Sequence, residues 1–217
     1  MARKRTIPKS PEGHKNYFII DANVLVYLAL PQMNRSKYIK FTDHKEQLRT
    51  ERCLEYWKII NKQLKENQAR IYVPDVCIAE AFKVLAKWYY KKKYFQNSRS
   101  YNQATKRLRK LISTPHREMS KAGRQVKIHD LGTNRDIIIS VDRFFERMYR
   151  GGKEVQTSDL ILLAAAKYLM DFYDISRDYL YILTCDNKLV KLISRIQELP
   201  NAINPTEDRY RADKTFI

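Results

Sequence analysis

The chain has 217 residues, of which 44% are hydrophobic, enough for one sizeable α/β domain and too apolar for a disordered chain. Its 5 glycines and 7 prolines exclude a linker-rich architecture, and the apolar run at 160–166 is too short to span a bilayer. The formal net charge of +18 indicates a polyanionic partner, and the lack of an apolar N-terminal segment leads us to expect a cytoplasmic protein with no membrane partner.

The first third of the chain alternates short apolar runs with helical patterns. Residues 1–15 are predicted to form a basic, flexible tail. The β-branched and aromatic runs at 17–20 and 71–73 predict two buried strands. Between them, the apolar residues at 24–30 predict a short helix and those at 44–67 a longer one.

The middle of the chain is predicted to be mostly helical. A helix should begin after Pro74, and the apolar spacing at 104–112 predicts a second helix. Together they predict an antiparallel helical arm at about 83–127. A short strand at 126–128 should follow, and then a helix whose start has Thr133 and Asp136 in the spacing of a capping box.

The last part of the chain returns to alternating elements. Ser158 should cap a helix, a strand is expected at 179–183, a helix at 187–197 and a final short strand at 202–204. This alternation predicts an α/β fold with a parallel central sheet of about five strands flanked by helices. We expect residues 16–217 to form a single domain that includes the arm.

Four of these apolar segments carry one acidic residue at an edge. Asp21 and Asp186 follow predicted strands, and Glu80 and Asp159 lie near the starts of predicted helices. Because ligands of parallel sheets bind beyond the carboxyl ends of the strands, the four carboxylates should meet there. Such a cluster repels itself unless cations fill it, and hard oxygen ligands suit Mg²⁺ or Mn²⁺. Each acid also has a simpler interpretation, as a helix cap or a solvated helix charge.

The basic charge is concentrated in the arm. Residues 83–127 hold fourteen Lys and Arg against the single acid Glu118, a balance of +13 in 45 residues. Six aromatic residues share the segment, and they would either stack on exposed bases or pack into the core. We predict that nucleic acid binds the following basic residues: Lys87, Lys91, Lys92, Lys93, Arg99, Lys106, Arg107, Arg109 and Lys110.

The cysteines are few and widely separated. Cys53, Cys77 and Cys185 form no CxxC pair, and the four histidines show no ligand spacing. We therefore expect reduced thiols, no disulfide framework and no zinc site.

The four acidic segments together resemble the motifs of PIN-domain nucleases. They are YFIIDANVLVYL, VPDVCIAEAFKVL, TSDLILLAAAKYL and YILTCDNKLVKL, in this order, and the resemblance spans about 17–205. It implies that Asp21 is the central metal ligand and that Glu80 and Asp159 bind the metal directly or through water. Asp186 would bind a second metal or orient a water molecule. Asn23 and Thr184 would hold these carboxylates by hydrogen bonds.

The resemblance implies a Mg²⁺- or Mn²⁺-dependent endoribonuclease that hydrolyses RNA phosphodiester bonds. Such proteins are often homodimers and are sometimes the toxin of a toxin–antitoxin pair, with an antitoxin protein as partner. The segment from Glu80 to Asp159 is longer than in the short toxins of this family, and the extra length coincides with the basic arm. A structure-selective DNA nuclease and a catalytically silent RNA-binding scaffold are the alternative functions.

Overall fold

The computed structural model describes five stretches of the chain. They are 15–30, 39–40, 44–112, 128–150 and 155–207, with the backbone alone for 147–150. The predicted tail at 1–15 lies outside the described residues except for Lys15, and so does 113–127, the last part of the predicted arm. The predicted sizes of the tail and the arm therefore stay predictions.

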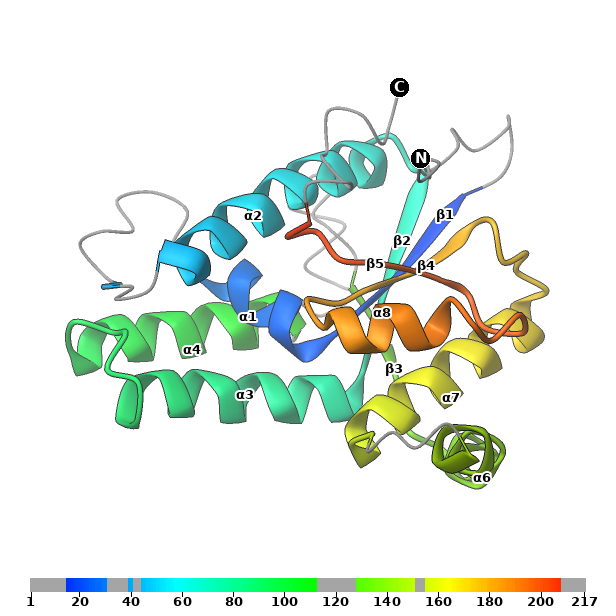
Figure 1. The fold of residues 1–217 in the computed structure, drawn as a ribbon. Coiled ribbons are helices and arrows are strands. Elements are labelled where there is room, and N and C mark those ends of the chain that lie inside the picture. Colours follow the sequence, from blue (N-terminus) through cyan, green and yellow to red (C-terminus); the bar gives the residue numbers. More distant parts are fainter. Residues whose placement is uncertain (1–14, 31–38, 41–43, 113–127, 151–154, 208–217) are drawn as a thin grey trace.

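A five-stranded parallel sheet forms the centre of the molecule (Figure 1). Its spatial order is β3-β2-β1-β4-β5. All four neighbouring pairs are parallel, which confirms the predicted α/β sheet. The strands are β1 (Asn16–Ile20), β2 (Ala69–Pro74), β3 (Ile128–Leu131), β4 (Leu180–Leu183) and β5 (Asn201–Ile203).

The central strands are buried on both faces, which is why their sequences are continuously apolar. Phe18, Ile19 and Ile20 of β1 are completely buried, and so is every residue of β4 to within a few per cent. Of the strand predicted at 126–128, residues 126 and 127 lie outside the described residues, and the described strand runs from Ile128 to Leu131. Within the described part of the chain it pairs with β2 alone and is half-buried, so its sequence lacks the apolar run that marks the others.

Seven helices of the described residues flank the sheet, with α1 to α4 on one side and α6 to α8 on the other (Figure 1). None of these helices is long and apolar enough to cross a membrane. They are α1 (Ala22–Ala29), α2 (His44–Lys65), α3 (Asp75–Tyr90), α4 (Ser98–Ile112), α6 (Arg135–Arg150), α7 (Thr157–Tyr173) and α8 (Asn187–Ile193).

The cap of α6 differs from the prediction. The N–H of Ile137 donates to Oδ1 of Asn134 at 2.9 Å, so Asn134 caps the helix and the capping box based on Thr133 is wrong. Asparagine is the stronger N-cap of the two residue types, and the helix therefore begins one residue later.

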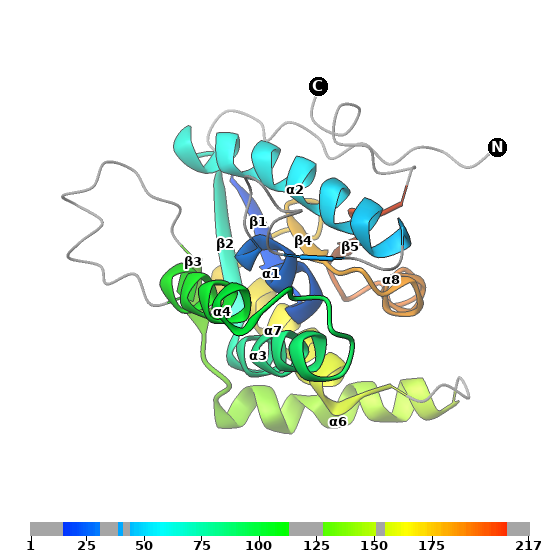
Figure 2. The same ribbon diagram turned by 90° about the vertical axis from the view of Figure 1, so that its left-hand side faces the viewer.

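The predicted helical pair at the start of the arm exists as α3 and α4, which lie side by side in both views (Figures 1 and 2). It is packed onto the domain, because Ala104 and Leu108 of α4 are completely buried and α4 contacts α1. The rings of Tyr89 and Tyr101 stack between the two helices, with centroids 4.7 Å apart. Trp88 is also buried, so for these aromatics packing into the core is the correct interpretation.

Candidate active site

The strand order reverses direction between β1 and β4, since β2 and β3 lie beyond β1 while β5 lies beyond β4. Ligands of open parallel sheets bind beyond the carboxyl ends of the strands at such a reversal. Asp21 directly follows β1 and Thr184 directly follows β4, and both are buried. The topology thus brings two residues of the predicted site to this point.

A hydrogen-bonded bridge joins the two strand ends. The hydroxyl of Thr184 donates to Oδ2 of Asp21 at 2.7 Å, and its oxygen accepts the N–H of Asp186 at 3.0 Å. The other carboxylate oxygen of Asp21 accepts the N–H of Ala22 at 2.6 Å. Asp21 is therefore held through both oxygens, and Thr184 takes the position expected of a residue that orients it.

Asp186 caps α8. Its Oδ1 accepts the backbone N–H groups of Lys188 at 2.7 Å and Leu189 at 3.3 Å. The simpler interpretation as a helix cap is thus correct for this residue. A cap engaged through one oxygen does not exclude a second task for the carboxylate, because each oxygen has its own lone pairs.

The other two acids approach from α3 and α7, which come into contact with each other. Asp159 lies in the first turn of α7, where the helix dipole favours a negative charge. Glu80 lies in the second turn of α3 and is half-buried.

Burial and mutual repulsion perturb these carboxyl groups. Burial, together with the smaller effects of the charges of Asp21, Asp186 and Glu80, raises the pKa of Asp159 to about 7. The pKa of Asp21 is also raised, to about 6, mainly by burial and to a smaller extent by the charge of Glu80. The hydrogen bonds that Asp21 accepts from Thr184, Ala22 and Asn23 offset part of this rise. The four carboxylates therefore lie within electrostatic reach of one another.

The donor set fits a hard divalent cation in its chemistry. Within the described residues, no three His, Cys, Asp or Glu side chains are placed closely enough to hold an ion together. Electrostatic repulsion acts over longer distances than coordination, so both observations hold at once. Mg²⁺ keeps several waters and needs only one or two carboxylates, and a cation here would relieve the repulsion at Asp159 and Asp21.

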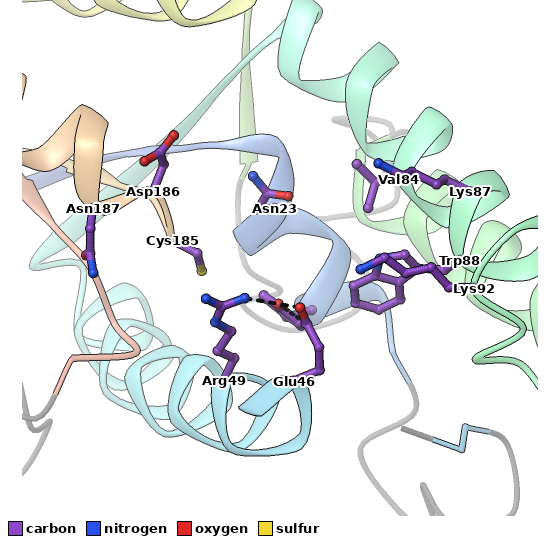
Figure 3. Close-up of a pocket in the computed structure, with 11 residues that line it drawn as sticks. Asn23, Glu46, Arg49, Val84, Lys87, Trp88, Lys92, Cys185, Asp186 and Asn187 are labelled. Carbon is purple, nitrogen blue, oxygen red and sulfur yellow. Dashed lines mark hydrogen bonds and ion pairs between the residues drawn. The ribbon is translucent and has the colours of Figure 1, made fainter. Parts of the chain in front are cut away.

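A cavity of about 370 Å³ has one of these acids, Asp186, in its lining (Figure 3). Asn23 also lines it, while Arg49, Lys87 and Lys92 contribute cationic side chains from α2, α3 and the residues after α3. The remaining lining residues are Tyr27, Glu46, Val84, Trp88, Cys185 and Asn187. The cavity therefore links the acidic end of the sheet to cations on neighbouring elements.

Two of the nine basic residues predicted to bind nucleic acid, Lys87 and Lys92, line this cavity. The ammonium of Lys92 also lies 5.1 Å from the ring centre of Tyr94. The other seven are exposed on or beside α3 and α4 and do not line the cavity: Lys91, Lys93, Arg99, Lys106, Arg107, Arg109 and Lys110. The nine predicted basic residues therefore form two groups, those that line the cavity and those exposed outside it.

A carboxylate and an arginine of the cavity were missed by the sequence analysis. Glu46 is 8% exposed, accepts the hydroxyl of Tyr27 at 2.7 Å and pairs with Arg49 at 3.1 Å. The signal in the sequence is weak, because Glu and Arg three positions apart are common on solvated helix faces.

The three cysteines are free thiols in the described residues, as the sequence predicts. The sulfurs of Cys53 and Cys185 lie 3.6 Å apart in a thiol contact, and Cys185 sits between Thr184 and Asp186 on the cavity wall. The hydrogen bond with Cys53, together with burial, raises the pKa of the Cys185 thiol.

Comparison with known proteins shows the fold. No family model and no curated protein sequence matches the chain. The structure of FitAB bound to the IR36 DNA fragment is similar, with 17% identity, a TM-score of 0.51 and coverage of 88% of this chain and 96% of that one. VapBC2 from Rickettsia felis, bound to a DNA fragment from its promoter, has 12% identity, a TM-score of 0.49 and coverage of 87% and 98%. FitAcB from Neisseria gonorrhoeae has 17% identity, a TM-score of 0.47 and coverage of 87% and 97%.

These neighbours are toxin–antitoxin complexes whose toxins are PIN-domain proteins. The similarity to FitAB extends over most of both chains, and the five-stranded parallel sheet agrees with the fold that the resemblance in the sequence implies. This chain therefore has the PIN-like α/β fold.

Proposed function

We propose that this protein is a metal-dependent endoribonuclease that hydrolyses RNA phosphodiester bonds at the acidic edge, defined as Asp21, Glu80, Asp159 and Asp186. The main support is that these carboxylates meet at the point where the strand order reverses, where burial and, to a smaller extent, their mutual repulsion raise the pKa of Asp159 and of Asp21. Carboxylates held together at such a cost are typical of sites that bind a cation.

The residues of the acidic edge have distinct roles in this proposal. Asp21 is the central ligand, fixed by the Thr184 hydroxyl and the Ala22 N–H, and its pKa is lowered by Asn23. Glu80 and Asp159 complete the set, directly or through water. Asp186, which is engaged at α8 through one oxygen, orients a water molecule or holds a second ion. Bound Mg²⁺ or Mn²⁺ supplies charge neutralisation at the phosphate and a more acidic water.

The cations beside the acidic edge hold the polyanion. Lys87 and Lys92 line the cavity together with Asp186, and the exposed lysines and arginines of α3 and α4 extend the basic surface. A cytoplasmic RNA suits this basic surface. The fold shared with FitAB also favours an antitoxin protein as a partner.

The test is cleavage of a mixed panel by the full chain. Structured RNA, single-stranded RNA and flap DNA are each incubated with Mg²⁺, Mn²⁺ or chelator. We expect RNA cleavage that requires the metal, and Mn²⁺ should also raise the melting temperature because it binds only the folded state. Cleavage of flap DNA alone would identify a DNA nuclease. RNA binding without cleavage or thermal response to Mn²⁺ would identify a silent scaffold.

A further inference from the structure

An arginine of α2, Arg49, forms part of the cavity wall. Arg49 projects from α2 toward the cavity, and Glu46 points at it from one turn earlier (Figure 3). The two oxygens of Glu46 are both engaged, one by the guanidinium of Arg49 and one by the hydroxyl of Tyr27. Arg49 is thereby fixed on one side while its side chain stays 45% exposed.

The ion pair of Glu46 and Arg49 contributes little to the stability of the fold. Burying the charge of Glu46 costs desolvation free energy, and an ion pair with a half-exposed arginine offsets little of it. A guanidinium has five N–H donors in a fixed fork, and Glu46 engages one end of it. The remaining donors are presented at the cavity, in a geometry suited to a phosphate.

The balance of charge along the lining suits one phosphodiester. Three cations, Arg49, Lys87 and Lys92, face two carboxylates, Glu46 and Asp186, which leaves a balance of +1. Asp186 repels a phosphate, so the favourable position for a phosphate lies beside the cations. A cavity of about 370 Å³ has the size of a site for one small ligand rather than for a long strand.

We infer that this cavity binds one nucleotide of a single-stranded RNA, next to the phosphodiester bond that is cleaved at the acidic edge, and that the guanidinium of Arg49 binds the phosphate of this nucleotide. Glu46 and Tyr27 act as positioning residues for Arg49. This inference rests on the proposed function for the identity of the polymer. It adds α2 to the surface that contacts RNA, beyond the basic residues of α3 and α4.

The experiment measures binding without cleavage. The full chain carrying Asp21→Asn is titrated, in the presence of chelator, with a labelled single-stranded RNA at several salt concentrations. Adding Arg49→Gln should weaken binding on the order of tenfold, as expected for loss of a charge-assisted hydrogen bond. The slope of log affinity against log salt should fall by about 0.7, because one phosphate contact is lost.

Lys58→Gln is the matched control. Lys58 is exposed on the same helix, nine residues from Arg49 and so on the opposite face, and it does not line the cavity. It removes the same charge and should leave affinity and slope nearly unchanged. Arg49→Lys keeps the charge but not the fork, so it should restore the slope and only part of the affinity.

Unchanged affinity and slope in a folded Arg49→Gln variant would overturn the inference, and so would a loss equal to that of Lys58→Gln. If Arg49→Gln fails to fold, Arg49→Lys decides, because wild-type affinity in that variant would contradict a contact that depends on the guanidinium fork. If the chain binds RNA through Arg49 but cleaves nothing, the proposed nuclease function is wrong and the nucleotide site stands. If the chain cleaves RNA and its RNA affinity does not depend on Arg49, the nucleotide site is wrong and the nuclease function stands.

Discussion

The acidic edge and the basic helices α3 and α4 carry their charges in different ways. Asp21 is 5% exposed and hydrogen-bonded through both oxygens, and its anchor Thr184 is completely buried. Lys91, Lys93 and Arg99 are exposed to solvent. Asp21 is therefore placed by a strand end and by hydrogen bonds before any ligand arrives, whereas the exposed side chains of the helices can change conformation to meet a ligand. Substitutions should therefore have large, specific effects at the acidic edge and small, additive ones along the helices.

The largest effect is expected for Asp21→Asn, which keeps the size of the side chain and removes its charge. Cleavage should fall about a thousandfold or more, because loss of the central ligand removes several kcal/mol of transition-state stabilisation. Single-turnover rates with Mn²⁺ provide the measurement. Asp142→Asn, on an exposed position of α6, is the control and should retain activity. Full activity in well-folded Asp21→Asn would refute the proposed role of the acidic edge.

The pH dependence of stability is the next largest effect. The pKa of Asp21 is raised from 3.8 to about 6 in the folded chain, so the folded state binds this proton more tightly than the unfolded state does. Metal-free stability should therefore decrease as the pH rises from about 4 to about 6, by about 3 kcal/mol from this group. Asp159 acts in the same direction, in a window that extends to about pH 7.

The difference between wild type and Asp21→Asn isolates this contribution. In urea unfolding with chelator, the variant should gain stability relative to wild type as the pH increases through that window. The difference for Asp142→Asn should be independent of pH. If the difference in the free energy of unfolding between Asp21→Asn and wild type is also independent of pH, burial does not raise the pKa of Asp21.

A smaller effect is expected for Thr184→Val, which keeps the shape of the side chain and removes the hydroxyl. The N–H of Asp186 loses its acceptor and Asp21 loses a donor, at a cost of about 1–2 kcal/mol in the free energy of unfolding. Cleavage should fall roughly 10- to 100-fold through the misoriented carboxylate. Thr184→Ser, which retains the hydroxyl, should recover most of the activity. If Val and Ser behave alike, the bridge has no role in orienting Asp21.

The smallest effects should come from the basic residues after α3. Changing Lys91, Lys92 and Lys93 together to Gln should weaken RNA binding roughly threefold to tenfold and flatten its salt dependence. Lys92 lines the cavity and the other two do not, so Lys92→Gln alone should account for most of this loss. RNA titrations at several salt concentrations test whether Lys92 contributes more than Lys91 and Lys93. A loss of RNA affinity in the Lys91→Gln, Lys93→Gln double variant equal to that in Lys92→Gln would contradict this expectation.

The sequence predicts the sheet and the positions of Asp21 and Asp186 well, because both follow apolar runs whose burial leaves few alternatives. It does not predict that α4 packs on α1, since the small Ala104 and the single Leu108 are a weak apolar signal among so many cations. It also misses the contact of Tyr27 in α1 with Glu46 in α2, two residues 19 positions apart in the chain. Such contacts depend on how helices pack and leave no local pattern.

The sulfur of Cys185 gives the cavity a built-in chemical reporter. Cys53 and Cys77 are each 1% exposed, whereas Cys185 is half-buried and lines the cavity, so a small uncharged thiol reagent should reach it first. Its raised pKa makes the reaction slow at neutral pH and faster in mild alkali. The rate of labelling would then measure how much of the cavity a bound oligonucleotide covers, in the unmodified chain and without any cleavage.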